Sequence, residues 1–399
     1  MRLFSKNLYY KSPNLVDLIN IFNSSIKNTL ESEFKIRYNT HQVYSFMSAR
    51  SALYFLLKNL NFKKQSNILV CGFTCEVVPA AIIYAGYIPK YLDINLDTLG
   101  IDKNIFLQTN LTNTKAVIIQ HTFGISGIYD EILDYCKNNN IFIIEDCSLA
   151  IFSKRNNILL GSFGDAAIFS FEISKTINAI RGGVLIINNT KLDYSIDYSL
   201  IPITPFLARI QLFLQVLFSY ILYNDYFHIV TKYFLYILYK IKLFRKSTSD
   251  LEYLVIMPKN YINKMPFFLK KFILSQLKRE IKIVNKNSII KNYYLSNINK
   301  NFIYPNSITN SNYLIRFPIF VNNKIELISI FRKNGYEIGS WFNSPLSSIN
   351  LNFYKFHYFS NSCPNSEFIS NKIINLPMHN KLTYSDLKVI IDIINKYGN

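Results

Sequence analysis

The sequence predicts an α/β protein built on a large, mostly parallel sheet, and two observations indicate this class. Between residues 48 and 190, short apolar runs alternate with helical patterns, which is typical of a parallel sheet covered on both faces. Beyond a hydrophobic insert at about 203–245, a long helical pattern leads into a mixed strand and helix segment. We therefore expect a large domain over residues 1–265, and a connecting helix with a smaller α+β domain over 266–399.

The individual elements follow from the spacing of the apolar residues. Short apolar runs are the strand candidates, at 68–71, 87–94, 116–120, 141–144, 166–171 and 184–187. Helical spacing predicts helices at 51–60, 77–84, 129–138, 266–296, 325–333 and 385–396. A further strand is expected at 313–320, and Thr383 is the expected N-cap of the last helix.

The charge and the distribution of the lysines indicate which kinds of molecule this protein binds. The chain of 399 residues carries a formal charge of +19, but its lysines are scattered and form no dense stripe, zinc-finger pattern or RNA-binding motif. We therefore expect no nucleic acid. Abundant lysine, isoleucine, asparagine and tyrosine is typical of an AT-rich genome, and a basic surface also suits an anionic small substrate.

The five cysteines form no regular framework, and the N-terminal residues lack the apolar core of a signal peptide. Cys71 and Cys75 have no second cysteine pair near them in the sequence, so we expect no metal site. Reduced thiols and a cytoplasmic location follow as expectations.

The hydrophobic stretch at 206–243 differs from the rest of the chain. Its two apolar segments are interrupted by polar residues such as Arg209, Gln215 and Lys240, and neither reaches the roughly 20 apolar residues that a spanning helix needs. We expect a buried helical hairpin or a dimer contact. The main alternative is a helix that lies on the inner face of a membrane through its aromatic residues and lysines. A true span is the least favoured interpretation.

The candidate chemistry is concentrated around Lys175. The apolar run 141–144 ends in Glu145-Asp146, and Ser170-Phe171-Glu172-Ile173-Ser174-Lys175 follows in the next part of the chain. Pyridoxal phosphate enzymes use a lysine amine that bonds to the cofactor aldehyde and a carboxylate that keeps the pyridine nitrogen protonated. We predict these roles for Lys175 and Asp146, and we expect the Ser170 hydroxyl to hold the phosphate. His121 ends a strand at the same edge, where it either lines the pocket or has a structural role.

Four blocks of sequence resemble the DegT/DnrJ/EryC1/StrS family of sugar aminotransferases. They occur in the family's order and together span residues 48 to 382, most of the chain. The blocks are Ser48-Ala49-Arg50-Ser51-Ala52-Leu53, Glu145-Asp146-Cys147-Ser148, Gly161-Ser162-Phe163-Gly164-Asp165 running on to Lys175, and Asn375-Leu376-Pro377-Met378-His379 followed by Leu382-Thr383.

The resemblance implies the fold of type I pyridoxal phosphate-dependent transferases and a transfer of nitrogen, usually from glutamate, to a nucleotide-linked keto sugar for a surface polysaccharide or glycan. It implies that the backbone amides of Ala49 and Arg50 hold the cofactor phosphate, that His379 approaches the substrate, and that a second subunit completes the active site of a homodimer. With His121 and His379, we assign Arg181 to the substrate side of the site.

The chain also departs from the family pattern. Leu149 stands where the family has glutamine or histidine near the phenolic oxygen of the cofactor, and Cys75 stands where an aromatic residue stacks on the pyridine ring. Phe73 is the candidate to replace that ring, and Arg181 replaces the glutamate of a Gly-Glu-Gly-Gly motif. The alternative hypothesis is therefore a binding or scaffold protein on the same fold whose catalytic power has eroded.

Overall fold

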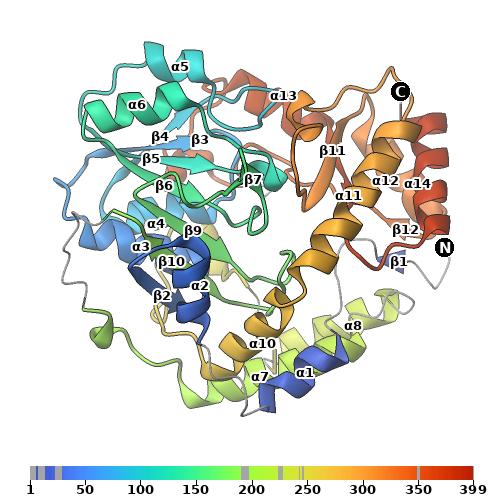
Figure 1. Ribbon diagram of the computed structural model, residues 1–399, viewed down its shortest axis with the longest axis horizontal. Helices are drawn as coiled ribbons and strands as arrows, with labels where there is room; N and C mark the ends of the chain where they lie inside the picture. Colours follow the sequence, from blue (N-terminus) through green and yellow to red (C-terminus); the bar gives the residue numbers. More distant parts are fainter. Residues whose placement is uncertain are drawn as a thin grey trace.

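The computed structural model describes residues 6–7, 14–22, 29–189, 197–222, 228–241, 243–244, 247–347 and 351–398. Its centre is a seven-stranded sheet with the order β2-β10-β9-β6-β5-β3-β4 (Figure 1). The strands are β2 (Gln42–Phe46), β3 (Asn67–Cys71), β4 (Ile88–Leu92), β5 (Thr114–Gln120), β6 (Phe142–Asp146), β9 (Ala166–Ser170) and β10 (Gly183–Ile187).

The prediction of a mostly parallel α/β sheet is confirmed. Strands β4, β3, β5, β6 and β9 pair in parallel, and β10 runs antiparallel to both of its neighbours, β9 and β2. The six strands predicted between residues 48 and 190 are all present in this sheet, with ends shifted by a few residues. Strand β2 was not predicted, because its sequence Gln-Val-Tyr-Ser-Phe is half polar, as suits an edge strand.

Helices cover both faces of this sheet because successive side chains of each strand point to opposite faces and both sets are apolar. On β5, Ala116 and Ile118 face a core formed with α3 (Ala49–Asn59) and α4 (Val77–Ala85). Val117 and Ile119 of the same strand face a second core. That core includes α2 (Leu30–Tyr38), α5 (Lys103–Gln108), α6 (Asp130–Asn138) and α10 (Phe267–Leu277).

The C-terminal part packs beside the sheet. The predicted helix over 266–296 is two helices, α10 and α11 (Glu280–Asn297), which are separated at Lys278 and Arg279. Thr383 caps the last helix as predicted, in a reciprocal capping box with Asp386. The other elements are β11 (Arg316–Phe320), α12 (Lys324–Lys333), β12 (Tyr336–Glu337), α13 (Pro364–Lys372), β13 (Ile373–Pro377) and α14 (Tyr384–Tyr397).

Short pairings complete this description. Strands β11 and β13 are antiparallel, and β12 pairs in parallel with β1 (Lys6–Asn7), so an N-terminal segment lies against the C-terminal part. A small hairpin joins β7 (Lys154–Arg155) to β8 (Ile158–Leu159). Single 3-10 turns lie at Thr122–Gly124, Tyr198–Leu200, Asn306–Ile308 and Phe353–Phe356.

The hydrophobic insert forms two helices, α7 (Phe206–Leu222) and α8 (His228–Lys240), and the short α9 (Asp250–Tyr253) follows them. Phe213 of α7 packs edge-on between Phe22 of α1 (Leu15–Phe22) and Phe268 of α10, with ring centroids 6.0 and 5.4 Å apart. The expectation of a buried hairpin is only partly correct, because the outer sides of both helices are exposed. Within the described ranges, no helix is long and apolar enough to cross a membrane.

The backbone of β10 at Gly183 lies directly against the start of α3, and a substitution at Gly183 tests this contact. A Cβ atom at Gly183 would lie 2.3 Å from the backbone nitrogen of Ala49 and 2.3 Å from the carbonyl carbon of Ser48. We expect Gly183→Ala to lower the free energy of unfolding by about 1–3 kcal/mol, because backbone must move to accommodate the methyl group. Urea denaturation measures this loss.

Ile187→Val on the same strand is the matched control, and it should cost about 0.5–1.5 kcal/mol through the loss of one buried methylene. Unchanged stability in Gly183→Ala would show that α3 can move away from β10 without loss.

Candidate active site

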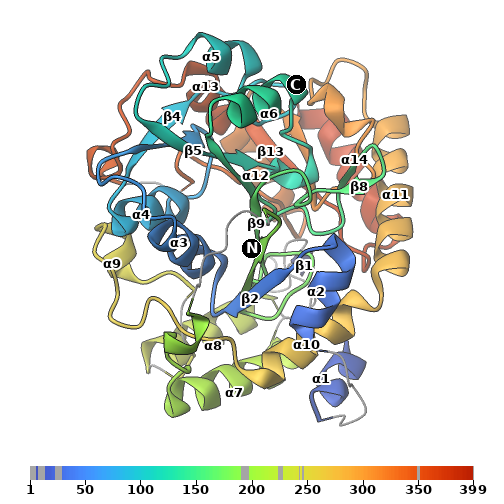
Figure 2. The same ribbon diagram turned by 60° about the vertical axis from the view of Figure 1, so that its left-hand side comes forward.

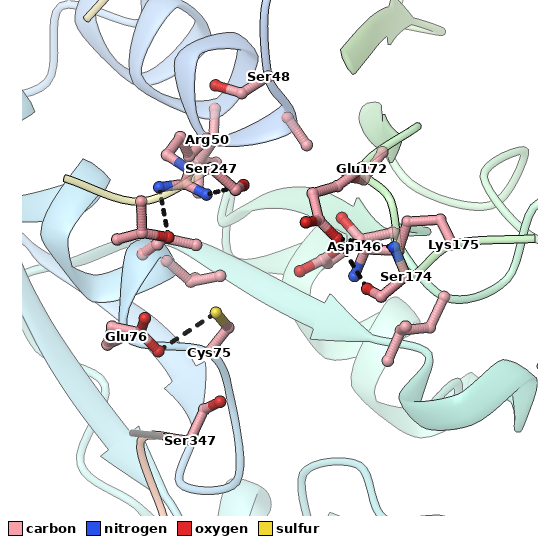
Figure 3. A pocket seen from close by; sticks show the side chains of 18 of the residues that line it. Ser48, Arg50, Cys75, Glu76, Asp146, Glu172, Ser174, Lys175, Ser247 and Ser347 are labelled. Atoms are coloured by element: carbon pink, nitrogen blue, oxygen red, sulfur yellow. Dashed lines mark hydrogen bonds between the residues drawn. The ribbon is translucent and has the colours of Figure 1, made fainter. Parts of the chain in front are cut away.

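A cavity of about 700 Å³ opens where β5, β6 and β9 end and α3 begins (Figure 3). Ligands of open α/β sheets bind at this edge. The cavity brings together nine of the residues singled out from the sequence: Ala49, Arg50, Cys75, His121, Asp146, Leu149, Ser170, Lys175 and Arg181.

Lys175 lies half-buried in the loop after β9, where its backbone N–H donates to the carbonyl of Glu172 at 2.9 Å. Burial lowers the pKa of Lys175 below its ordinary value, and the negative charge of Glu172 partly opposes this shift. A lysine with a lowered pKa offers more of its neutral, nucleophilic amine near neutral pH.

Two carboxylates lie on the same side of the cavity as Lys175 (Figure 3). Asp146 is buried at the end of β6, and its Oδ1 accepts a hydrogen bond from the backbone N–H of Ser148 at 2.9 Å. Glu172 Oε2 accepts from both the backbone N–H and the hydroxyl of Ser174, at 3.0 and 2.8 Å. Both carboxylates are thus held in place by the loops that carry them.

The start of α3 forms another wall of the cavity. Ser48 is the N-cap, and its Oγ accepts from the backbone N–H of Ser51 at 3.2 Å. Ala49 and Arg50 form the first helical turn, whose N–H groups have no acceptor within the helix. Such a helix start attracts anions through these donors and the helix dipole. Ser170, at the end of β9, lines the same cavity.

The side chain of Arg50 has a structural partner. Its Nη1 lies 2.6 Å from Glu252 Oε1 and 3.2 Å from Thr248 Oγ1, and its Nη2 donates to Ser247 Oγ at 3.4 Å. Burial alone would lower the pKa of Arg50, but the Glu252 carboxylate raises it well above the ordinary value. The guanidinium therefore holds the segment before and within α9 against the start of α3 (Figure 3).

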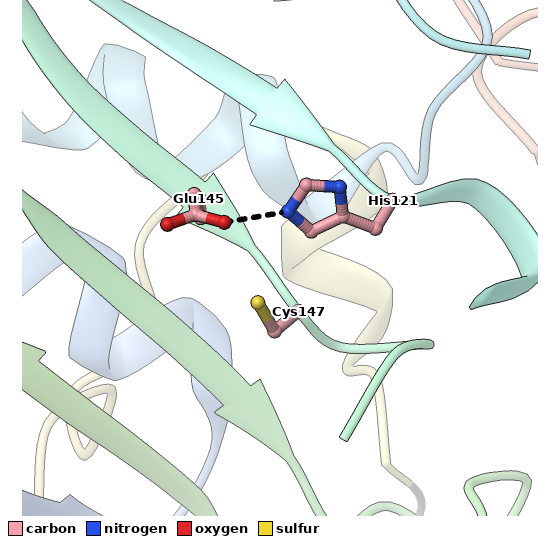
Figure 4. A group of neighbouring side chains, drawn as sticks. All are labelled: His121, Glu145 and Cys147. Carbon is pink, nitrogen blue, oxygen red and sulfur yellow. Dashed lines mark hydrogen bonds and ion pairs between the residues drawn. The ribbon is translucent and has the colours of Figure 1, made fainter. Parts of the chain in front are cut away.

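The hydrogen bonds of His121 indicate a structural role, one of the two roles that the sequence allows for it (Figure 4). Its Nδ1 accepts from the backbone N–H of Gly127 at 3.2 Å, so the proton is assigned to Nε2, which lies 2.9 Å from Glu145 Oε2. Both side chains are fully buried. His121 still contributes to the wall of the cavity.

Glu145 connects the ends of β5 and β6 to residues 161–164 through hydrogen bonds. Its two oxygens accept from the backbone N–H groups of Gly161, Phe163 and Gly164, each at 2.7 Å, in addition to His121. The sulfur of Cys147 lies near this pair, and the three potential ligand atoms fall within 4.8 Å of one another. The nitrogen and oxygen atoms of this group are already engaged with protein partners, so the arrangement is a hydrogen-bond centre.

Two residues assigned to the site from the sequence lie outside the cavity. The fully buried ring of Phe73 packs edge-on against Phe342 with centroids 4.9 Å apart and does not line the cavity, so the structure gives no support to Phe73 as the stacking ring. His379 follows β13 and is not among the residues that line the cavity, so its assignment to the substrate is not supported.

The two departures from the family pattern do face the cavity. Leu149 presents an apolar side chain there. Cys75 Sγ lies 3.3 Å from Glu76 Oε2, and burial raises the pKa of this thiol, which keeps it protonated. Neither residue offers the polar or aromatic group that the family pattern has at its position.

Trp341 is the site residue that sequence reasoning missed most clearly. It lines the cavity from the C-terminal part of the chain, with Lys175 Nζ 5.9 Å from its ring centroid. The buried Arg316 of β11 lies over the same ring at 4.3 Å. Trp341 is the single tryptophan of the chain, and no other feature of the sequence pointed to it as a site residue. Other lining residues that were not assigned to the site include Glu76, Glu172, Ser174, Ser247 and Thr248.

The sequence matches the DegT/DnrJ/EryC1/StrS aminotransferase family over residues 21–198 and 263–395. The chain belongs to this family, as the four blocks of sequence indicated. The unmatched segment between the two ranges contains α7, α8 and α9.

Relatives and solved structures agree with this assignment. The chain is 28% identical over 162 residues to GDP-perosamine synthase of Escherichia coli O157:H7, which covers 41% of this chain and 44% of the relative. It is 30% identical over 163 residues to the spore coat polysaccharide biosynthesis protein SpsC of Bacillus subtilis, or 41% and 42% of the two chains. The chain thus aligns with less than half the length of these curated relatives.

The aminotransferase PseC of Helicobacter pylori, involved in the biosynthesis of pseudoaminic acid, superposes with a TM-score of 0.73 over 98% of each chain at 18% identity. The putative sugar aminotransferase Spr1654 of Streptococcus pneumoniae, in its PMP form, gives 0.72 over 97% of this chain and 98% of the other, also at 18% identity. These likenesses confirm the predicted fold of the type I pyridoxal phosphate-dependent transferases.

Glu145 should be critical for stability. Glu145→Ala would leave the three backbone N–H groups and the His121 ring without their buried acceptor. We expect the free energy of unfolding to fall by about 3 kcal/mol or more, since each unsatisfied buried donor costs about 1–3 kcal/mol. Urea denaturation tests this against the exposed Asp134→Ala on α6, which should change stability little. Similar losses in both variants would contradict a central role for Glu145.

Glu172 should control the protonation of Lys175. Its charge raises the pKa of Lys175, so Glu172→Gln should lower that pKa further, and the neutral amine should then appear at lower pH. The measurement is the pH dependence of the rate at which Lys175 reacts with pyridoxal 5′-phosphate, read by absorbance and by mass spectrometry after borohydride reduction. We expect the midpoint to move to lower pH.

Ser174→Ala is the matched control, because it removes a hydrogen bond to Glu172 but keeps the carboxylate charge. Its midpoint should stay near that of the unaltered protein. A Glu172→Gln midpoint that also stays in place would exclude this electrostatic role.

Proposed function

We propose that this chain is a pyridoxal phosphate-dependent aminotransferase that moves an amino group, from glutamate, to a nucleotide-linked keto sugar for a surface polysaccharide or glycan. The observation that carries the proposal is the convergence of Lys175, Asp146 and Ser170 on one cavity at the carboxyl ends of the sheet strands. Asp146 and Ser170 end two neighbouring strands, and Lys175 lies in the loop that follows Ser170. Membership of the family gives this arrangement a chemical meaning.

The residues present fit the cofactor. The cavity of about 700 Å³ is of the size that small-molecule sites have. Asp146 would pair with the pyridine nitrogen, Lys175 would attach to the aldehyde, and the start of α3 with Ser170 would hold the phosphate. When bound, the cofactor supplies the electron sink that stabilises negative charge on the substrate carbon.

The reaction also needs a base that moves a proton at the substrate carbon, and Lys175 is the group placed to do so. Because burial lowers its pKa, a larger share of the amine is neutral and able to accept a proton. The nearby Glu172 stabilises the charged form that results. The hydrogen bond from the Ser148 N–H holds the Asp146 carboxylate in one orientation, in which it would pair with the ring nitrogen of a bound cofactor.

The family and the names of the relatives support the substrate class. GDP-perosamine synthase is a relative whose name refers to a nucleotide-linked amino sugar. A nucleotide sugar carries a diphosphate, which suits the charge of +19 on this chain. Arg181, which lines the cavity, is the residue that we assign to this end of the substrate.

We further propose a cytoplasmic homodimer, in which a second subunit completes the active site. This proposal rests on the family's architecture. This chain builds the wall of the cavity around Lys175 from its own residues. The second subunit would therefore add residues to other parts of the wall.

Leu149 and Cys75 favour one competing function, a binding or scaffold protein without turnover. Both line the cavity and neither offers the contact expected at its position. Trp341 weakens this alternative, because it places an aromatic surface in the cavity from another part of the chain.

The decisive test is the visible absorbance of the purified protein with pyridoxal 5′-phosphate. We expect a band that Lys175→Ala lacks, that changes on addition of glutamate, and that is restored by a keto-sugar nucleotide. Turnover should fall in Lys175→Ala by about 10²–10⁴-fold or more, the range of an acid–base group.

Lys154→Ala, at an exposed lysine, should leave both band and turnover unchanged. A folded, unaltered protein that shows no band with the cofactor would favour the scaffold function instead.

A further inference from the structure

Helix α7 is apolar on two opposite sides. Its inner side buries Ala208, Leu212 and Val216 against the rest of the protein. Its outer side presents Phe206 and Leu207, which are 70% and 67% exposed. A helix that is apolar on two opposite sides is normally covered on both of them. We therefore expect another molecule to cover the outer side of α7.

The two helices that contact α7 also expose apolar side chains. On α1, Ile19 and Phe22 are 59% and 68% exposed, and on α8 Tyr233 and Tyr236 are 69% and 63% exposed. Figures 1 and 2 both show α1, α7 and α8 along one edge of the molecule. We call the outward sides of these three helices the apolar face. Scattered single hydrophobic residues are normal on a surface, but exposed apolar side chains gathered on three neighbouring helices mark a binding surface.

On the described parts of the helices that form and border the apolar face, the exposed charged side chains are basic. Helices α7, α8 and α10 contain no aspartate or glutamate in their sequences. The guanidinium of Arg209 lies over the exposed ring of Phe206 at 5.6 Å, and Lys271 Nζ lies over the exposed ring of Phe267 at 4.9 Å. The acidic residue of α1, Asp17, is buried and paired with Arg279 at 2.6 Å.

These features select one class of partner. Helices α7 and α8, of 17 and 13 residues, fall short of the length that crosses a bilayer. A second copy of the chain would bring an equally basic face to this one, and like charges would oppose pairing. Anionic phospholipid is complementary, because basic residues attract its headgroups while tyrosine and phenylalanine rings enter the boundary below them.

We propose that the apolar face docks this protein on the surface of an anionic phospholipid bilayer. The helices lie in the plane of the membrane, with their outward rings and aliphatic side chains among the lipids and Arg209, Lys240 and Lys271 at the headgroups. Both α7 and α8 belong to the segment that the family match leaves out. The docking surface is thus an addition to the shared catalytic architecture, and it is independent of the proposed reaction.

Co-flotation of the full chain with vesicles tests the proposal without any measurement of activity. We expect binding to vesicles of equal parts phosphatidylcholine and phosphatidylglycerol, weaker binding at high salt, and little binding to phosphatidylcholine alone. Phe206→Ser/Leu207→Ser/Ile210→Ser should reduce partitioning about tenfold or more, because three outward apolar side chains are lost. Arg209→Glu/Lys240→Glu should reduce binding to the anionic vesicles and leave the low binding to neutral vesicles as it is.

The matched control is Ile325→Ser/Phe368→Ser, at two exposed positions of α12 and α13 (81% and 56%) away from the apolar face. It should bind the anionic vesicles as the unaltered protein does. Absent binding by the unaltered protein, or equal binding by the triple variant, would overturn the proposal. So would a triple variant that has a smaller mass in sedimentation without lipid, because the face would then be a contact between copies of the chain.

Discussion

The buried carboxylate of Glu145 is the interaction on which the geometry of the site depends. It accepts hydrogen bonds from the His121 ring and from three backbone N–H groups at 161–164, so it joins the ends of β5 and β6 to the loop before β9. Successive residues of a strand point to opposite faces. Anchoring Glu145 on one face of β6 therefore orients Asp146 on the other, and the Ser148 N–H then holds the Asp146 carboxylate.

The remaining walls of the cavity are set by close backbone contacts and by one buried ion pair. Gly183 lets β10 run directly against the start of α3, which places Ala49 and Arg50 beside the strand ends. Arg50 then uses its side chain to hold Glu252. The same helix start thus has two functions: its backbone faces the cavity as an anion site, and its side chain secures the chain that returns from α7 and α8.

The pKa of Lys175 depends on its burial in this cavity and on the carboxylates beside it. Burial favours the neutral amine, and the carboxylates of Glu172 and Asp146 favour the charged one. A lysine that must both attach to an aldehyde and carry a proton needs both forms, and burial and the two carboxylates favour opposite ones. The apolar face on α1, α7 and α8 lies outside this enclosure and is connected to it through the segment that Arg50 holds.

The sequence by itself determined the sheet, because apolar runs of strand length alternating with helices leave few other folds, and it determined which loops carry the chemistry, because Asp146, Ser170 and Lys175 lie at or just beyond strand ends. Only the tertiary structure decided the direction of side chains whose partners are distant in the chain. Phe73 turns toward Phe342, Arg50 toward Glu252, and Trp341 enters the cavity from the C-terminal part. Local spacing specifies a strand or helix, whereas such orientations depend on contacts between segments far apart in the sequence.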